Sequence, residues 1–118
     1  MLNLDFSGVK SIEALEEGTY MATIEVVEET VAKSSGNPML KVKYSVDGTN
    51  NKLFDNFVLT DAAMWKLKEL LGSLGYDTSE IVDLDVNELV GQQVQLIVIQ
   101  EEYEGNTVNR VKKILPAA

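Results

Sequence analysis

Alternating apolar and polar positions run through most of the chain and predict a protein made mainly of β-strands. Between Thr19 and Lys33, β-branched residues alternate in two phases, and the phase slips by one residue at Val26-Val27. Such a slip is typical of a β-bulge, which lets a long strand bend so that its halves serve different parts of a curled sheet. We therefore expect a long, bent first strand in which Tyr20, Ala22, Ile24 and Val26 form one phase and Val27, Glu29 and Val31 form the other.

Two shorter strands follow, bounded by turn-forming residues at 34–38 and 47–51. The first spans Met39 to Val46, with Lys41 and Lys43 on its polar face. The second spans Lys52 to Leu59, with Phe54 pointing outward beside Lys52. The inward sets of these two strands are Leu40, Val42, Tyr44 and Val46, and then Leu53, Phe57 and Leu59.

The next segment has the period of an amphipathic helix from Asp61 to Leu74, with Thr60 as its N-cap and Gly75 as its stop. Its apolar stripe contains Ala63, Met64, Leu67, Leu70, Leu71 and Leu74. Trp65 lies opposite that stripe. Further along, Asp85 and Glu88 have the spacing of a capping box for a short helical turn.

The chain ends with a predicted hairpin, Val94 to Tyr103 and Thr107 to Leu115, joined by a turn at 104–106. Three strands, one main α-helix and two strands form the element order of a five-stranded OB-like barrel, with the helix between strands 3 and 4. An orthogonal β-sandwich or a small α+β sheet with one covering helix fits the same order. We expect a single domain over residues 1–118, in which residues 1–17 are an N-terminal extension that packs on the barrel or on a partner.

Composition narrows the possible chemistry, because the 118 residues include neither histidine nor cysteine. The usual general base, thiol nucleophile and transition-metal ligands are therefore missing. Asp83 and Asp85 lack the spacing of a calcium loop, and no phosphate-binding glycine motif occurs. We expect a protein that is not an enzyme and that uses no cofactor or metal, with a carboxylate-metal nuclease as the remaining enzymatic alternative. The chain contains no apolar run of membrane-spanning length and no signal peptide, so we expect a cytoplasmic protein without membrane contact.

The net charge of −9 argues at first against nucleic acid, because phosphate binding depends on Lys and Arg. The charge is unevenly distributed along the chain, however. The segments 31–68 and 106–118 each carry +3, while the rest carries −15. The basic segments coincide with the strands that form the binding groove of an OB barrel.

The candidate nucleic-acid-binding residues follow from this coincidence. We expect phosphate contacts from Lys33, Lys41, Lys43, Lys52, Arg110 and Lys112, and base stacking on Phe54 and Tyr103. Each residue also has a structural explanation. The lysines fit the solvated face of a strand, Phe54 could cover a second small core, and Tyr103 could brace the hairpin.

Trp65 suggests a second functional surface, because a fully solvated tryptophan on a helix is uncommon. We expect the N-terminal segment, through Leu2, Leu4 and Phe6, or a second subunit to cover it, with base stacking as a further alternative. A homodimer or higher oligomer is therefore a possible assembly.

Several ordered motifs resemble a family of small phage and prophage proteins of formerly unknown function that are often described as single-stranded-DNA-binding. These motifs span residues 18–116 and are Gly18-Thr19-Tyr20, Ser35-Gly36-Asn37-Pro38-Met39, Leu53-Phe54-Asp55-Asn56-Phe57, Trp65-Lys66-Leu67-Lys68, Tyr103-Glu104-Gly105 and Asn109-Arg110-Val111-Lys112. The resemblance implies an OB-type protein that protects single-stranded DNA during phage replication or recombination in the bacterial cytoplasm. Recombination or replication proteins of the phage or host would be its partners. The alternative is a phage interaction or assembly module that uses the barrel only as a scaffold.

Overall fold

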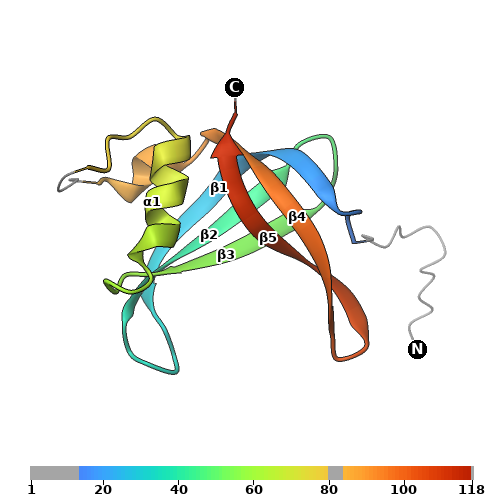
Figure 1. The fold of residues 1–118 in the computed structure, drawn as a ribbon, viewed down its shortest axis with the longest axis horizontal. Coiled ribbons are helices and arrows are strands. Elements are labelled where there is room, and N and C mark those ends of the chain that lie inside the picture. Colours follow the sequence, from blue (N-terminus) through green and yellow to red (C-terminus); the bar gives the residue numbers. More distant parts are fainter. Residues whose placement is uncertain (1–13, 80–83, 118) are drawn as a thin grey trace, which may run out of the picture.

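A computed structural model describes residues 14–79 and 84–117, and a single antiparallel sheet dominates it (Figure 1). One α-helix, α1 (Met64–Ser73), and one turn of 3-10 helix, η1 (Val86–Leu89), separate the third and fourth strands. The strands are β1 (Gly18–Val31), β2 (Pro38–Val46), β3 (Lys52–Val58), β4 (Gln93–Tyr103) and β5 (Asn106–Pro116).

The strand order is β3-β2-β1-β4-β5, so β1 pairs with both β2 and β4 at the centre of the sheet. The sheet curls until its two edge strands, β3 and β5, come into contact without joining in a hydrogen-bonded ladder. This arrangement confirms the expected fold class, a mainly β, OB-like barrel of five strands with its main helix between strands 3 and 4. The barrel is partly open.

The predicted bulge in β1 exists, but it lies one residue before the expected slip. Ile24 pairs with Tyr44 and Val26 pairs with Lys43, so Glu25 is the extra residue. Val26 is therefore out of phase with Ile24, contrary to the prediction, and it is 43% exposed on the outer face. Beyond the bulge, Val27 packs against the core instead.

The inward faces of β2 and β3 form much of the hydrophobic core, as expected, with Leu59 packed partly buried at its margin. The core residues from these strands are Leu40, Val42, Tyr44, Val46, Leu53 and Phe57. The alternation along β3 also carries Asp55 into the interior, since it lies between Leu53 and Phe57 on the same face. The burial of this carboxylate was not predicted.

Helix α1 covers one end of the barrel and buries Leu67, Leu70 and Leu71. The prediction that it begins at Asp61 with Thr60 as N-cap is wrong. Residues 61–63 form a turn, closed by a hydrogen bond from the Ala63 N–H to the Thr60 carbonyl, and no side chain caps the helix. Its end is as predicted, because Gly75 adopts φ +89 and the amides of residues 75 and 76 bond back to the last turn in a Schellman motif.

Asp85 is the N-cap of η1, and its carboxylate accepts a hydrogen bond from the Asn87 N–H at 3.0 Å. Residues 104 and 105 alone form the turn between β4 and β5, and both have positive φ.

Of the expected N-terminal extension, residues 1–13 lie outside the described residues. Leu15 is buried, and its backbone bonds to the side chains of Gln100 and Asn109 on that hairpin.

Candidate nucleic-acid interface

The outward side chains of β1, β2 and β3 form one continuous surface, here called the outer face. Strand register sets its layout, because directly paired residues of neighbouring strands lie side by side. One row contains Phe54, Lys43 and Val26, and the next contains Asn56, Lys41 and Glu28. Lys52 and Ser45 are paired beyond the first row. The structure thus brings together four of the predicted binding residues, Lys41, Lys43, Lys52 and Phe54.

Phe54 is the exposed aromatic side chain of this surface, with 60% of its area open to solvent. The ammonium group of Lys43 lies 5.9 Å from the centre of its ring, within cation-π range. Beside the ring is a hollow of about 150 Å³ lined by Val26, Glu28, Lys41, Lys43 and Phe54. Phe54 therefore covers no second core, and its ring is available for stacking.

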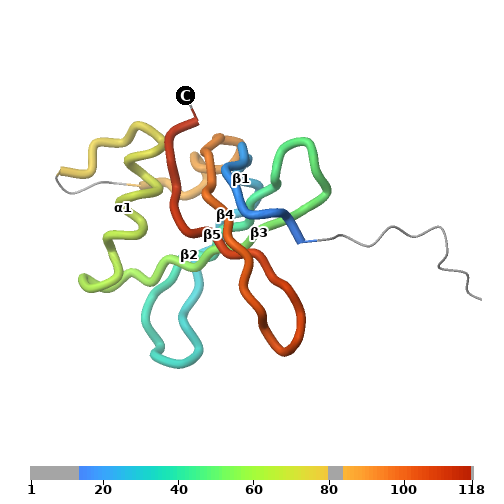
Figure 2. Tube along the Cα trace, turned by 45° about the vertical axis from the view of Figure 1, so that its right-hand side comes forward, coloured from blue at the N-terminus to red at the C-terminus, as the bar shows by residue number. Residues whose placement is uncertain are grey.

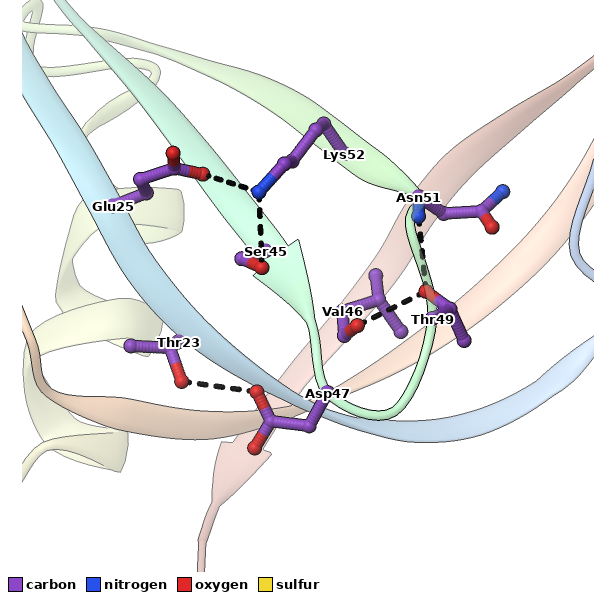
Figure 3. A network of polar contacts seen from close by, with 8 residues as sticks. All are labelled: Thr23, Glu25, Ser45, Val46, Asp47, Thr49, Asn51 and Lys52. Atoms are coloured by element: carbon purple, nitrogen blue, oxygen red, sulfur yellow. Dashed lines mark hydrogen bonds and ion pairs between the residues drawn. The ribbon is translucent and has the colours of Figure 1, made fainter. Parts of the chain in front are cut away.

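Lys52 is less available than the sequence implied, because a glutamate from β1 binds it (Figure 3). Its Nζ donates to Glu25 Oε2 at 2.9 Å and to Ser45 Oγ at 3.2 Å. The Lys52 hydrogen bond lowers the pKa of Glu25 below its ordinary value. The bulge explains this contact, because the extra residue in β1 is the one that meets Lys52.

Glu25 and Glu28 change the expected electrostatics of the site. Both belong to the segment that the charge count placed outside the basic strands, yet β1 runs beside β2 and carries them onto the outer face. The described face therefore holds three lysines and two glutamates. A count of charges along the chain could not reveal this mixture, because the position of the two glutamates beside the lysines depends on how the strands pair.

The two predicted cations of β5 lie apart from this arrangement. Arg110 Nη1 contacts Glu101 Oε1 at 3.2 Å, and both side chains are largely exposed. Lys112 is the extra residue of a second bulge, since Ile97 pairs with Lys113 and Val98 with Val111.

Lys33 lies in the β1–β2 turn, and Tyr103 is the last residue of β4, next to the β4–β5 turn. Figures 1 and 2 show the β1–β2 turn and the β4–β5 turn projecting toward the same side of the molecule. Both residues are exposed. The tip of the β4–β5 hairpin also carries exposed Glu101, Glu102 and Glu104, which would repel phosphates near Tyr103.

Trp65 on α1 is 65% exposed within the described part of the chain. The residues expected to cover it, Leu2, Leu4 and Phe6, lie outside the described residues. Nearby, Met64 lines an apolar cavity of about 440 Å³ between α1 and the inner side of the sheet, together with Leu40, Leu59, Leu67 and Leu71. This cavity is larger than the outer-face hollow but lies on the other side of the sheet.

A polar cluster in the barrel interior links α1 to β3 and was not predicted. Lys66 Nζ donates to Asp55 Oδ1 and, at 3.1 Å, to the Asn56 carbonyl, and it lies 5.0 Å from the centre of the Phe57 ring. Burial raises the pKa of Asp55, and Lys66 offsets only part of that effect. Burial also raises the pKa of Tyr44, with Asp55 and Glu69 adding to it. Among the described residues, Tyr44 Oη and Asp55 Oδ2 have no hydrogen-bond partner.

Among residues 14–79 and 84–117, no three acidic side chains converge as a potential metal site. In the same part of the chain, no helix has the length and apolar content needed to cross a lipid bilayer.

The partly open barrel, its end-capping helix and its lysine- and phenylalanine-bearing outer face define a small OB-like protein. A family model described as "Protein of unknown function (DUF669)" matches residues 2–118, so the chain belongs to this family. The match agrees with the resemblance to a family of unknown function noted from the motifs. No curated protein matches the sequence.

Proposed function

We propose that this protein binds single-stranded DNA without catalysing a reaction, and that it does so through the outer face. The observation that carries the proposal is Phe54, which is exposed on the outer face of the edge strand β3, paired with Lys43 of β2 and beside a hollow. Stacking of a base on such a ring contributes about 1 to 3 kcal/mol and tolerates any sequence. Protection of single strands during phage replication or recombination in a bacterial cytoplasm is the role that fits.

The acidity of the rest of the chain favours a single strand over a duplex. With a net charge of −9, most of the surface repels phosphates. One narrow strand can follow the lysines of β2 and β3 between the two projecting turns, whereas a duplex would press its second backbone against acidic surroundings. Lys33 in the β1–β2 turn would extend the path at one end.

A titration of labelled oligo-dT at several salt concentrations tests the proposal. We expect affinity to fall with salt, with a log-log slope of about −0.7 for each phosphate contact. The double variant Lys41→Gln, Lys43→Gln should flatten this slope, whereas Lys68→Gln on α1 should leave it unchanged. An absence of binding at micromolar protein and low salt would refute the proposal. Magnesium-dependent loss of the DNA would instead indicate a nuclease.

The exposure of Trp65 favours a second candidate function, self-association or assembly through α1 with the barrel as scaffold. Light scattering on the wild type and on Trp65→Ala distinguishes the two. A stable oligomer that dissociates in the variant, with no DNA binding by either protein, would support the assembly function. An unchanged mass would exclude this surface as the interface.

A further inference from the structure

The hollow beside Phe54 contains a carboxylate as well as lysines. Glu28 lines it together with Lys41, Lys43 and Val26. A glutamate in a phosphate-binding surface weakens binding by repulsion, so its presence needs a reason. The simplest structural reason would be an ion pair with a neighbouring lysine.

That ion pair does not form within the described part of the chain. Glu28 lies directly opposite Lys41 in the β1–β2 register, but the two charged groups are not in contact. Elsewhere on the sheet, glutamates do bind cations, as Glu25 binds Lys52 and Glu101 binds Arg110. Glu28 is exposed, and its carboxylate is open to a ligand placed in the hollow.

We propose that Glu28 reads the Watson-Crick edge of a base stacked on Phe54 and thereby makes the site prefer guanine over thymine. The inference rests on the proposed function, because it names a specificity-determining residue within the same single-strand site. In this arrangement, Phe54 stacks on the face of the base, and Glu28 accepts hydrogen bonds from the edge of the same base.

The layout of the sheet gives a base the necessary room. Phe54 and Glu28 lie two strands and one row apart, which corresponds to about 12 Å between their backbones at ordinary strand spacings. Both side chains line the hollow of about 150 Å³. A base placed there would present its edge to the carboxylate while Lys41 and Lys43 remain beside its phosphates.

The chemistry of the carboxylate favours guanine. An ionised carboxylate is only an acceptor and can bind two adjacent donors at once. Guanine offers its N1–H and its exocyclic N2 amine side by side, whereas cytosine and adenine offer one amino group and thymine offers one N–H. A two-point contact of this kind discriminates between bases by roughly tenfold or more.

The test compares the affinity of three oligonucleotides for the wild type. They are oligo-dT, the same length with isolated guanines, and the same length with inosine at those positions, since inosine lacks the N2 amine. We expect the guanine strand to bind about tenfold more tightly than oligo-dT, with the inosine strand in between. Glu28→Gln should bring the three affinities within about twofold of one another, because a neutral amide presents one acceptor only.

Glu29→Gln is the matched control, since it removes the same charge one position along β1 on the opposite side of the sheet, where Glu29 lines the larger cavity. It should leave the guanine preference intact. Equal binding of all three strands by the wild type would overturn the inference while leaving the single-strand function standing, as would a guanine preference that survives Glu28→Gln. Failure to bind any strand would overturn the proposed function itself.

Discussion

Lys66 of α1 and Asp55 of β3 form an ion pair at the margin of the barrel interior, where the aspartate side chain is only 8% exposed and the lysine side chain 32%. Lys66 also donates to the backbone of β3 and lies over the Phe57 ring. One lysine therefore attaches the helix to an edge strand through three kinds of contact.

Lys66→Met should lower the free energy of unfolding by about 2 to 3 kcal/mol at neutral pH, because it leaves the Asp55 carboxylate buried without its cation. Urea unfolding followed by circular dichroism measures the change. Lys68→Met, on an exposed position of the same helix, should change stability by less than about 0.5 kcal/mol. Equal losses in the two variants would contradict a specific role for the pair.

The raised pKa of Asp55 predicts how stability depends on pH. A folded-state pKa above the unfolded value of about 3.8 means that the folded protein holds this proton more tightly. The contribution of Asp55 is thus fully present below that value and is lost as pH rises through the folded pKa. The stability of the wild type relative to Asp55→Asn should therefore decline as pH rises from 3 toward neutrality. A relative stability that increases over this range would show that the carboxylate prefers its charged form.

Glu25→Gln should strengthen binding to oligo-dT, because it removes a negative charge from the outer face and releases Lys52 for a phosphate. The salt dependence should steepen by about 0.7 in log-log slope if Lys52 gains one phosphate contact. Fluorescence titration at several salt concentrations measures both quantities. The control Glu29→Gln should leave the slope unchanged, and weaker binding by Glu25→Gln would show that Glu25 positions Lys52 instead of competing with DNA.

Phe54→Ala should weaken binding to oligo-dT by about tenfold or more through loss of base stacking, with little change in salt dependence. Trp65→Ala is the matched control, because Trp65 is also an exposed aromatic residue but lies on α1. Its affinity should equal that of the wild type. Weaker binding by Trp65→Ala together with unchanged binding by Phe54→Ala would place the binding surface on α1.

Two substitutions in the β4–β5 turn should change the stability of the fold in opposite directions. Glu104 has φ +51, a conformation that asparagine adopts more readily, so Glu104→Asn should stabilise the fold by about 0.5 to 1 kcal/mol. Gly105→Ala should destabilise it by about 1 kcal/mol through backbone strain alone, because φ is +79 and an added Cβ would meet no atom within 4 Å. Thermal unfolding measures both, and a neutral Gly105→Ala would show that the turn changes its conformation.

The sequence predicted those features that depend on local alternation. The burial of Tyr44 and Phe57 and the exposure of Phe54 follow from the two-residue period of a strand, and Gly75 ends α1 because it adopts a positive φ. The start of α1 was predicted wrongly at Thr60, because capping residue types occur in turns as well as at helix ends.

Features that depend on pairing between distant segments were missed. The contact of Glu25 with Lys52 requires the register of β1 on β2 and a bulge at one particular residue. The burial of Asp55 follows from alternation, but only the position of Lys66 on α1 shows how the barrel tolerates it. The charge count along the chain failed for the same reason. It assigned Glu25 and Glu28 to the acidic part of the chain, although the sheet places them beside the lysines of β2 and β3.

The open seam between β3 and β5 has a consequence for the behaviour of the protein at high concentration. An edge strand with unpaired amides and carbonyls is a template onto which another chain can add, leading to aggregation. By binding the Asn56 carbonyl, Lys66 occupies one of these positions on β3, so α1 also shields that edge. Detachment of α1 would therefore leave this edge of β3 open to pairing with another chain.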